Sequence, residues 1–191
     1  MIKVSIIYHS VRGHTEQQAK AILKGLHTVD GIDARMIPVS EVKDNWDFIN
    51  ESEALIFGSP TFMGTISAEF KKFMDETSKI WMRQEWKDKI AAGFVNSGWP
   101  SGDKLNTMNQ LVIFAAQHGM IWVSLGEIPG NLSRDPAKKE INRIGSFLGA
   151  MACSPFDQSS DVAPPACDLE TAELFGKRIG QVTVRWVKGK E

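Results

Sequence analysis

The chain has 191 residues, of which 42% are hydrophobic and 24% charged, the composition of an ordinary globular chain with a sizeable core. Its formal net charge is −1 and it has no basic run, which argues against a nucleic-acid surface. No apolar segment reaches the roughly 18 residues of a membrane span. Because Met1 leads straight into an apolar run without a signal-peptide pattern, we expect a cytoplasmic protein.

The first element is an apolar β-type run, Ile2–Tyr8, followed by a loop over residues 9–15 and a helix over about 14–28. The loop contains Ser10, Gly13 and Thr15. A buried strand that turns through such residues into a helix is a phosphate-binding design, because the first N–H groups of the helix and its dipole face the anion. An ordinary strand–turn–helix with a Ser or Thr cap is the alternative.

A second strand is predicted over Ala34–Val39 and a polar connection over Asn45–Asn50. The short apolar run Ala54–Gly58 is typical of a strand buried on both faces. Ser67 is placed to cap the next helix. Four side chains would share one face of that helix: Phe70, Phe73, Met74 and Thr77.

Ile90–Val95 is the next buried-strand candidate. The helix that follows carries apolar residues at helical spacing and ends before Gly119, a natural C′ residue. We expect a short fifth strand over Met120–Val123.

The segment Leu125–Ala166 is rich in Gly, Pro and Ser, with one short helix opened by Asp135 and Pro136. A loop of this length is usually functional or packs against another subunit. Asp168 is then expected to cap a final helix. One face of that helix would bear Ala172, Phe175, Ile179, Val182 and Trp186.

This alternation of strands and helices predicts an α/β fold, a doubly wound parallel sheet in a single domain over residues 1–191. Three loops rich in Gly, Ser, Thr or Pro follow candidate strands at residues 9–15, 59–66 and 96–103. Ligands of such sheets bind at the carboxyl ends of the strands, so we expect the three loops to converge on one site. No Asp, Glu or His set has metal-ligand spacing, and the two cysteines, Cys153 and Cys167, read as plain thiols.

The pattern Ser10-x-x-Gly13-x-Thr15 resembles the phosphate loop of flavodoxins. Over nearly the whole chain, the sequence resembles the WrbA-type NAD(P)H:quinone oxidoreductases and NADPH-dependent FMN reductases of the flavodoxin-like family. The motifs that carry this resemblance are Tyr8-His9-Ser10-Val11-Arg12-Gly13-His14-Thr15, Gly58-Ser59-Pro60-Thr61-Phe62-Met63-Gly64, Phe73-Met74-Asp75-Glu76-Thr77 and Gln117-His118-Gly119-Met120.

The resemblance implies a flavodoxin-like, five-stranded parallel sheet of order 2-1-3-4-5 with helices on both faces. It implies bound FMN, two-electron reduction by NADH or NADPH, and hydride transfer to a quinone-type acceptor in a ping-pong cycle. It also implies a homodimer or homotetramer with sites near the subunit contacts.

Carried over by position, the FMN phosphate would be held by Ser10, Val11, Arg12, Gly13, His14 and Thr15. The isoalloxazine ring would be lined on one side by Pro60, Thr61, Phe62 and Met63. Its other side would be wrapped by Ser97, Gly98, Trp99, Pro100, Ser101 and Gly102. His118 would be the catalytic residue at the mouth of the pocket, and the substrate pocket would comprise Trp81, Trp99 and His118.

The chain departs from the family pattern at three places. Arg12 stands where an uncharged residue is usual, so it adds a charge to the phosphate or faces solvent. Trp99-Pro100 interrupts a Gly/Thr-rich run and could obstruct the substrate pocket. Phe62-Met63 replaces an Arg-Phe pair, which removes a cation from the neighbourhood of the flavin.

Two other classes of function remain open. An electron-carrier flavodoxin would bind FMN without a nicotinamide site, although the near-neutral charge lacks the acidic docking surface usual for such carriers. A non-enzymatic flavodoxin-like binding protein is the second, and Trp99-Pro100 is the feature that favours it.

Overall fold

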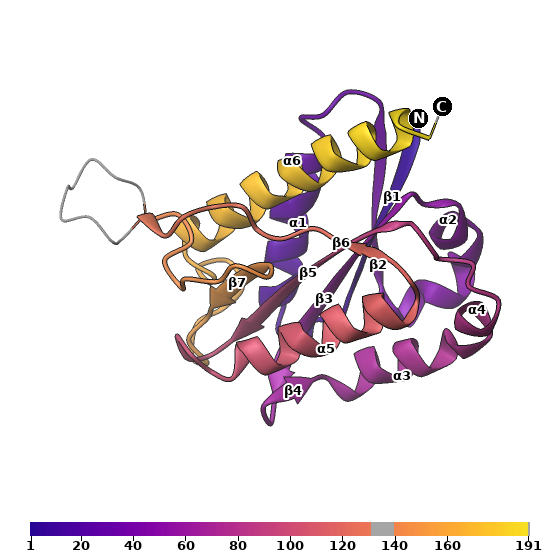
Figure 1. Ribbon diagram of the computed structural model, residues 1–191. Helices are drawn as coiled ribbons and strands as arrows, with labels where there is room; N and C mark the ends of the chain where they lie inside the picture. The colour runs from indigo at the N-terminus through magenta and orange to yellow at the C-terminus, as the bar shows by residue number, and fades with distance from the viewer. Residues whose placement is uncertain (131–139, 191) are drawn as a thin grey trace.

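The computed structural model describes residues 1–130 and 140–190 and shows a twisted sheet between two layers of helices (Figure 1). The main path of the sheet is parallel and has the order β2-β1-β3-β5-β6. Its strands are β2 (Ile32–Pro38), β1 (Ile2–Tyr8), β3 (Ala54–Phe62), β5 (Ile90–Ser97) and β6 (Ile121–Trp122). This confirms the doubly wound, flavodoxin-like α/β fold predicted from the sequence, with β5 as the fourth parallel strand.

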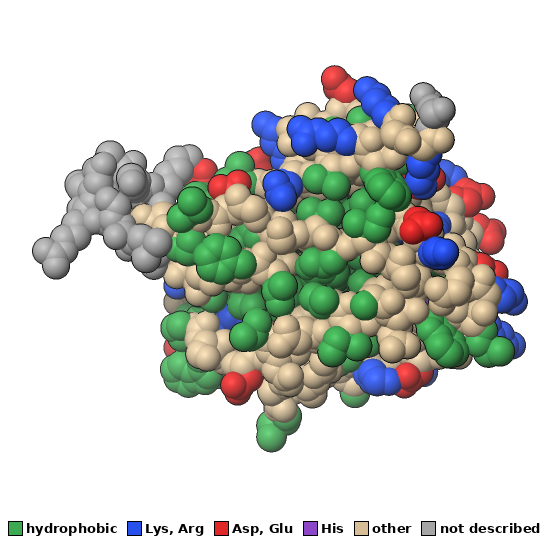
Figure 2. Space-filling model, viewed as in Figure 1, with side chains coloured by type: hydrophobic (Ala, Val, Ile, Leu, Met, Phe, Trp, Pro, Cys, Tyr) green, Lys and Arg blue, Asp and Glu red, His purple; other side chains and the backbone are tan. Residues whose placement is uncertain are grey.

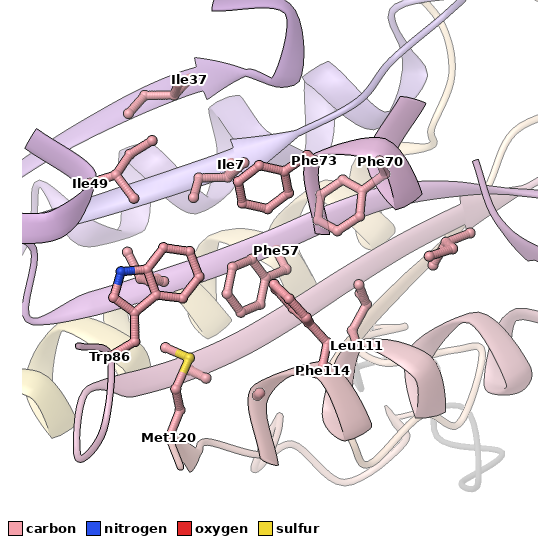
Figure 3. Close-up of a cluster of buried hydrophobic side chains, with 14 of the residues drawn as sticks. Ile7, Ile37, Ile49, Phe57, Phe70, Phe73, Trp86, Leu111, Phe114 and Met120 are labelled. Atoms are coloured by element: carbon pink, nitrogen blue, oxygen red, sulfur yellow. The ribbon is translucent and has the colours of Figure 1, made fainter. Parts of the chain in front are cut away.

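Side chains alternate along each strand and build one apolar layer on either face of the sheet. Ile6 and Ile56 point to the layer that packs against α1 (His14–Leu26) and α6 (Ala166–Lys188). Their neighbours Ile7 and Phe57 point to the opposite layer, drawn in Figure 3. That second layer is rich in aromatic rings, which meet mostly edge to face: Phe57, Phe70, Phe73, Trp86 and Phe114.

The aromatic layer is covered by α2 (Trp46–Glu51), α3 (Ala68–Glu76) and α5 (Lys104–Gln117). The helix α2 and the 3-10 helix Val39–Asp44 before it were not predicted, because the segment reads as a polar connection. Phe48 and Ile49 are nevertheless buried and anchor α2 to the sheet. The predicted cap of α3 is confirmed, since the Ser67 side chain accepts a hydrogen bond from the Phe70 N–H.

The fifth position of the sheet is filled by two short strands. β6 pairs with the beginning of β5, and β7 (Ala150–Cys153) pairs with its end, from Phe94 to Ser97. The intervening segment is therefore inserted into the fifth strand, and the indole N–H of Trp122 donates to the Leu148 carbonyl across the junction, at 2.8 Å. The sequence predicted only the first piece. The helix expected at Asp135 and Pro136 lies outside the described residues.

The expected capping role of Asp168 is wrong. Helix α6 begins at Ala166 after Pro165, and Asp168 lies inside its first turn, 2% exposed. Its carboxylate accepts two hydrogen bonds from Arg143, at 2.7 and 2.8 Å, and one from the Cys153 N–H, at 2.9 Å. Asp168 therefore ties α6 to the end of β7 and to the inserted segment.

Figure 2 shows hydrophobic side chains spread over the middle of the face between α6 and α5, while Lys, Arg, Asp and Glu gather along α6 and one edge. Across residues 1–130 and 140–190, no helix has the length and apolar character of a membrane span.

The approach of α1 to α6 yields the first prediction. A Cβ added at Gly176 would lie 2.1 Å from the backbone oxygen of Ile22, whereas one at Gly180 would lie 3.1 Å from the end of the Val29 side chain. Gly176→Ala is expected to lower the free energy of unfolding by about 2 kcal/mol despite better helix propensity. Gly180→Ala, the matched control, should stay within about 1 kcal/mol in urea unfolding. Equal effects of the two variants would contradict the role given to helix contact.

Candidate functional site

The carboxyl ends of β1, β3 and β5 border an open cleft. All three predicted loops reach it. The predicted residues that line the cleft are Ser10, Val11, Arg12, His14, Thr15, Pro60, Thr61, Phe62, Ser97 and Gly98. Three lining residues were not among the predicted site residues, although the first of them belongs to the predicted third loop: Asn96, Ser154 and Phe156.

The first loop forms an open cradle at the start of α1. Gly13 has a φ of 82°, in the left-handed region, which turns the chain into the helix. Among residues 1–130 and 140–190, no acceptor meets the N–H groups of residues 11–15, while the Glu16 N–H donates to the Ser10 hydroxyl at 3.3 Å. Unpartnered N–H groups at the positive end of a helix dipole form a site for an anion.

A segment after β7 packs over this loop. The Arg12 guanidinium donates to the Phe156 carbonyl at 2.7 Å, and His14 Nε2 lies 2.9 Å from the Gln158 carbonyl oxygen. A Cβ added at Gly13 would lie 2.8 Å from the Ser160 hydroxyl. Arg12 therefore bonds the backbone of a later segment. From the sequence we expect it either to add a charge at the phosphate or to face solvent.

The second loop is a tight hairpin. β3 runs on to Phe62 and pairs antiparallel with β4 (Thr65–Ile66). Met63 and Gly64 both have positive φ and form the turn between them. Pro60, Thr61 and Phe62 consequently face the cleft, while Met63 stands fully exposed at the tip.

The third loop offers donors and one acceptor to the cleft. Among the described residues, the N–H groups of Gly98, Trp99, Ser101 and Gly102 meet no acceptor. Asn96 is 3% exposed and its amide nitrogen donates to the Ser154 hydroxyl at 2.9 Å, while its Oδ1 has no partner within residues 1–130 and 140–190. A buried acceptor without a partner is costly, and a donor on a molecule bound in the cleft would satisfy it.

Trp99 does not fill the cleft. The residue is 66% exposed, and its indole meets the ring of Phe156 edge to face, with centroids 6.1 Å apart. Pro100 and Ser101 line a different surface depression, beside Leu105 and Phe147. Within one chain, the obstruction expected from Trp99 is therefore not seen, and the two aromatic rings form an exposed rim.

His118 and Trp81 line a separate hollow that shares no residue with the cleft. His118 is 2% exposed, its Nε2 lies 2.9 Å from the Thr77 hydroxyl, and its ring packs 4.6 Å from that of Trp86. Burial lowers the pKa of His118 to about 4, so the imidazole is neutral near pH 7. The catalytic assignment of His118 remains a prediction. Within one chain, the structure does not bring it to the three loops.

The described residues contain no group of three His, Cys, Asp or Glu that could hold a metal ion. The three lining residues that were missed were not equally predictable. Asn96 directly follows the predicted buried strand, so its place at the carboxyl end of that strand could have been predicted. Ser154 and Phe156 follow β7, a strand of four residues inside a Gly- and Pro-rich segment.

Residues 2–131 match the family model described as NADPH-dependent FMN reductase. Flavodoxin FldP from Pseudomonas aeruginosa is 38% identical over 184 residues, covering 95% of this chain and 97% of that protein. An NAD(P)H dehydrogenase (quinone) from Archaeoglobus fulgidus is 29% identical, with the same coverage of each chain. The crystal structure of a flavodoxin, WrbA-like protein from Agrobacterium tumefaciens has a TM-score of 0.74, 35% identity and coverage of 97% and 99%.

The buried state of His118 predicts a dependence of stability on pH. The unfolded chain binds a proton at this residue near pH 6.5 and the folded chain only near 4, so stability falls as the pH drops through that window. The loss should amount to about 3 kcal/mol, measured by urea unfolding at several pH values.

His118→Gln should remove most of this dependence on pH. His27→Gln, at an exposed histidine, serves as the control and should leave the dependence in place. An unchanged slope in the His118 variant would show that other groups cause the acid sensitivity.

Proposed function

The chain belongs to the NADPH-dependent FMN reductase family, and from that membership we propose that it is an FMN-dependent NAD(P)H:quinone oxidoreductase. The observation that carries the proposal is the cradle at residues 10–15, where five N–H groups without a partner among the described residues lie at a helix N-terminus beside the cleft. A phosphate ester is the anion that this arrangement suits.

The residues present fit FMN at both ends of the cleft. Ser10 to Thr15 would hold the phosphate, and Gly13 supplies the positive φ that turns the loop into α1. Pro60 and Phe62 on one side and Gly98 on the other offer an apolar slot for a flat ring. The Oδ1 of Asn96 would accept a hydrogen bond from the ring edge.

Bound FMN would supply the capacity to take a hydride from a nicotinamide and pass two electrons on. The protein would orient the two partners and stabilise charge. The unpartnered N–H groups of Gly98, Trp99, Ser101 and Gly102 would favour negative charge on the adjacent ring. No acid–base residue is needed for hydride transfer, which agrees with a neutral, buried His118.

A quinone-type acceptor is proposed because a relative at 29% identity is named an NAD(P)H dehydrogenase (quinone). We place the protein in the cytoplasm as one FMN-binding domain over residues 1–191, in a homodimer or homotetramer. Trp81, which is exposed at its hollow, would then meet the flavin of a neighbouring subunit, and the buried His118 would lie in the wall of the same hollow.

An electron-carrier flavodoxin is the second candidate. A relative at 38% identity is named a flavodoxin, and the exposed rim of Trp99 and Phe156 would suit contact with a partner protein at the cleft. The two candidates differ in whether a nicotinamide reaches the flavin directly.

The phosphate cradle is tested by Gly13→Glu. The substitution places a carboxylate and a strained φ among the N–H groups, so we expect FMN affinity to fall at least 100-fold, roughly 3 kcal/mol. Gly31→Glu is the matched control, because Gly31 also has positive φ, at 84°, with open space around it. Fluorescence titration of apoprotein with FMN measures the effect, and thermal unfolding checks that both variants fold. Unchanged FMN affinity in Gly13→Glu would exclude this loop as the phosphate site.

The activity is tested by the visible spectrum of the FMN-loaded protein under anaerobic conditions. Prompt bleaching by NADH or NADPH, followed by recovery of the colour on adding a quinone, is the expected result. A flavin that stays yellow with both nicotinamides but is bleached by dithionite would favour the electron carrier.

A further inference from the structure

Lys104 is a fully buried lysine at the first position of α5, with no exposed surface. Two physical effects oppose a cation there. The N-terminus of a helix is the positive end of its dipole, and burial removes the water that solvates an ammonium group. Burial accordingly lowers the pKa of Lys104. A positive charge in this position is stable only if an anion or several hydrogen-bond acceptors lie close to it.

The partners inside the protein are neutral. The Lys104 ammonium donates to the Ser97 hydroxyl at 2.8 Å and to the Trp99 carbonyl. Across residues 1–130 and 140–190, no carboxylate lies within ion-pair distance of it. Cys153 and Asp168 contribute favourable fields, but the Asp168 carboxylate already accepts hydrogen bonds from Arg143 and from the Cys153 N–H.

The backbone is bent so that this charge lies beneath the third loop. Gly102 and Asp103 are consecutive residues with positive φ, at 51° and 54°, and they turn the chain back before α5 begins. A Cβ added at Gly102 would lie 2.1 Å from the Ser97 hydroxyl, so a glycine is needed for the loop to close over the ammonium. Ser97 itself lines the cleft, which leaves the Lys104 charge one hydrogen bond away from it.

We propose that Lys104 sets the reduction potential of the bound flavin by binding reduced FMN more tightly than oxidised FMN. This inference rests on the proposed function. A hydride delivers two electrons and one proton, so the ring that receives it becomes an anion unless a second proton is taken up. A desolvated cation behind the loop favours that anion, because charges interact strongly where water is excluded. The buried ammonium makes no direct ion pair with the described residues, and the reduced ring would supply a counter-ion.

The experiment compares Lys104→Met and Lys104→Gln with wild type and with Lys72→Met. Lys72 lies on the exposed face of α3, so its substitution makes the same change of net charge without touching the loop. Dissociation constants are measured for oxidised FMN by fluorescence and for dithionite-reduced FMN under anaerobic conditions. The midpoint potential is measured independently by equilibration with a reference dye.

Both Lys104 variants are expected to bind reduced FMN about tenfold more weakly relative to oxidised FMN than wild type does. A tenfold change in this ratio corresponds to about 30 mV in the potential of a two-electron couple, in the negative direction. Lys72→Met should match wild type in both measurements. Lys104→Arg should stay closer to wild type than the neutral variants, since it keeps the charge.

Equal weakening of the two redox states would overturn the inference and leave Lys104 as a support of the loop. If wild type binds no FMN, the proposed function fails and this inference fails with it. Should the neutral variants not fold, wild type still tests the premise of an anionic reduced ring. Uptake of two protons per two electrons at mildly acidic pH, read from the pH dependence of the potential, would mean a neutral ring and would overturn the inference.

Discussion

The parallel pairing of β1, β3 and β5 is the interaction on which the site depends. Their register places Tyr8 beside Gly58 and Pro60 beside Asn96, so the loops that follow the three strands begin side by side at one edge of the sheet. The position of each strand fixes the position of the cleft-lining residues that follow it. The strands are buried on both faces, so a shift in register would expose apolar side chains to water. The geometry of the cleft is thus a consequence of the core.

The second piece of the fifth strand, β7, brings a fourth segment of the chain to the cleft. Because β7 pairs with the last residues of β5, the segment after β7 leaves the sheet beside the third loop and crosses to the first loop. There the Phe156 carbonyl accepts a hydrogen bond from Arg12, and the Gln158 carbonyl contacts the ring of His14. Asp168 fixes the arrangement by accepting the Cys153 N–H at the end of β7. A substitution far along the sequence, near residue 168, therefore acts on the wall of the cleft.

The sequence was most informative where burial imposes a pattern. Continuous apolar runs predicted β1, β3 and β5, and the polar loops after them predicted the cleft. The failures have one physical cause, which is that their stabilising contacts are distant in sequence. β7 has four residues and is held by β5, α2 is held to the sheet by two buried apolar residues of its own, and Asp168 is held by Arg143. No local signal distinguishes such a carboxylate from a helix cap.

The chemistry of the cleft differs from end to end, and this difference narrows the class of molecule that fits. One end presents unpartnered N–H groups at a helix N-terminus, which favour a dianionic group. The other presents apolar surface from Phe62 and Phe156, a lone acceptor on Asn96, and the field of a buried cation. A ligand that satisfies both ends has a phosphate, a flat apolar body, an N–H at the edge of that body and the capacity to become negatively charged. Most phosphorylated metabolites lack the last property, whereas a flavin ring acquires it on reduction. The polar and charged groups around the cleft therefore favour a redox cofactor over a phosphorylated substrate.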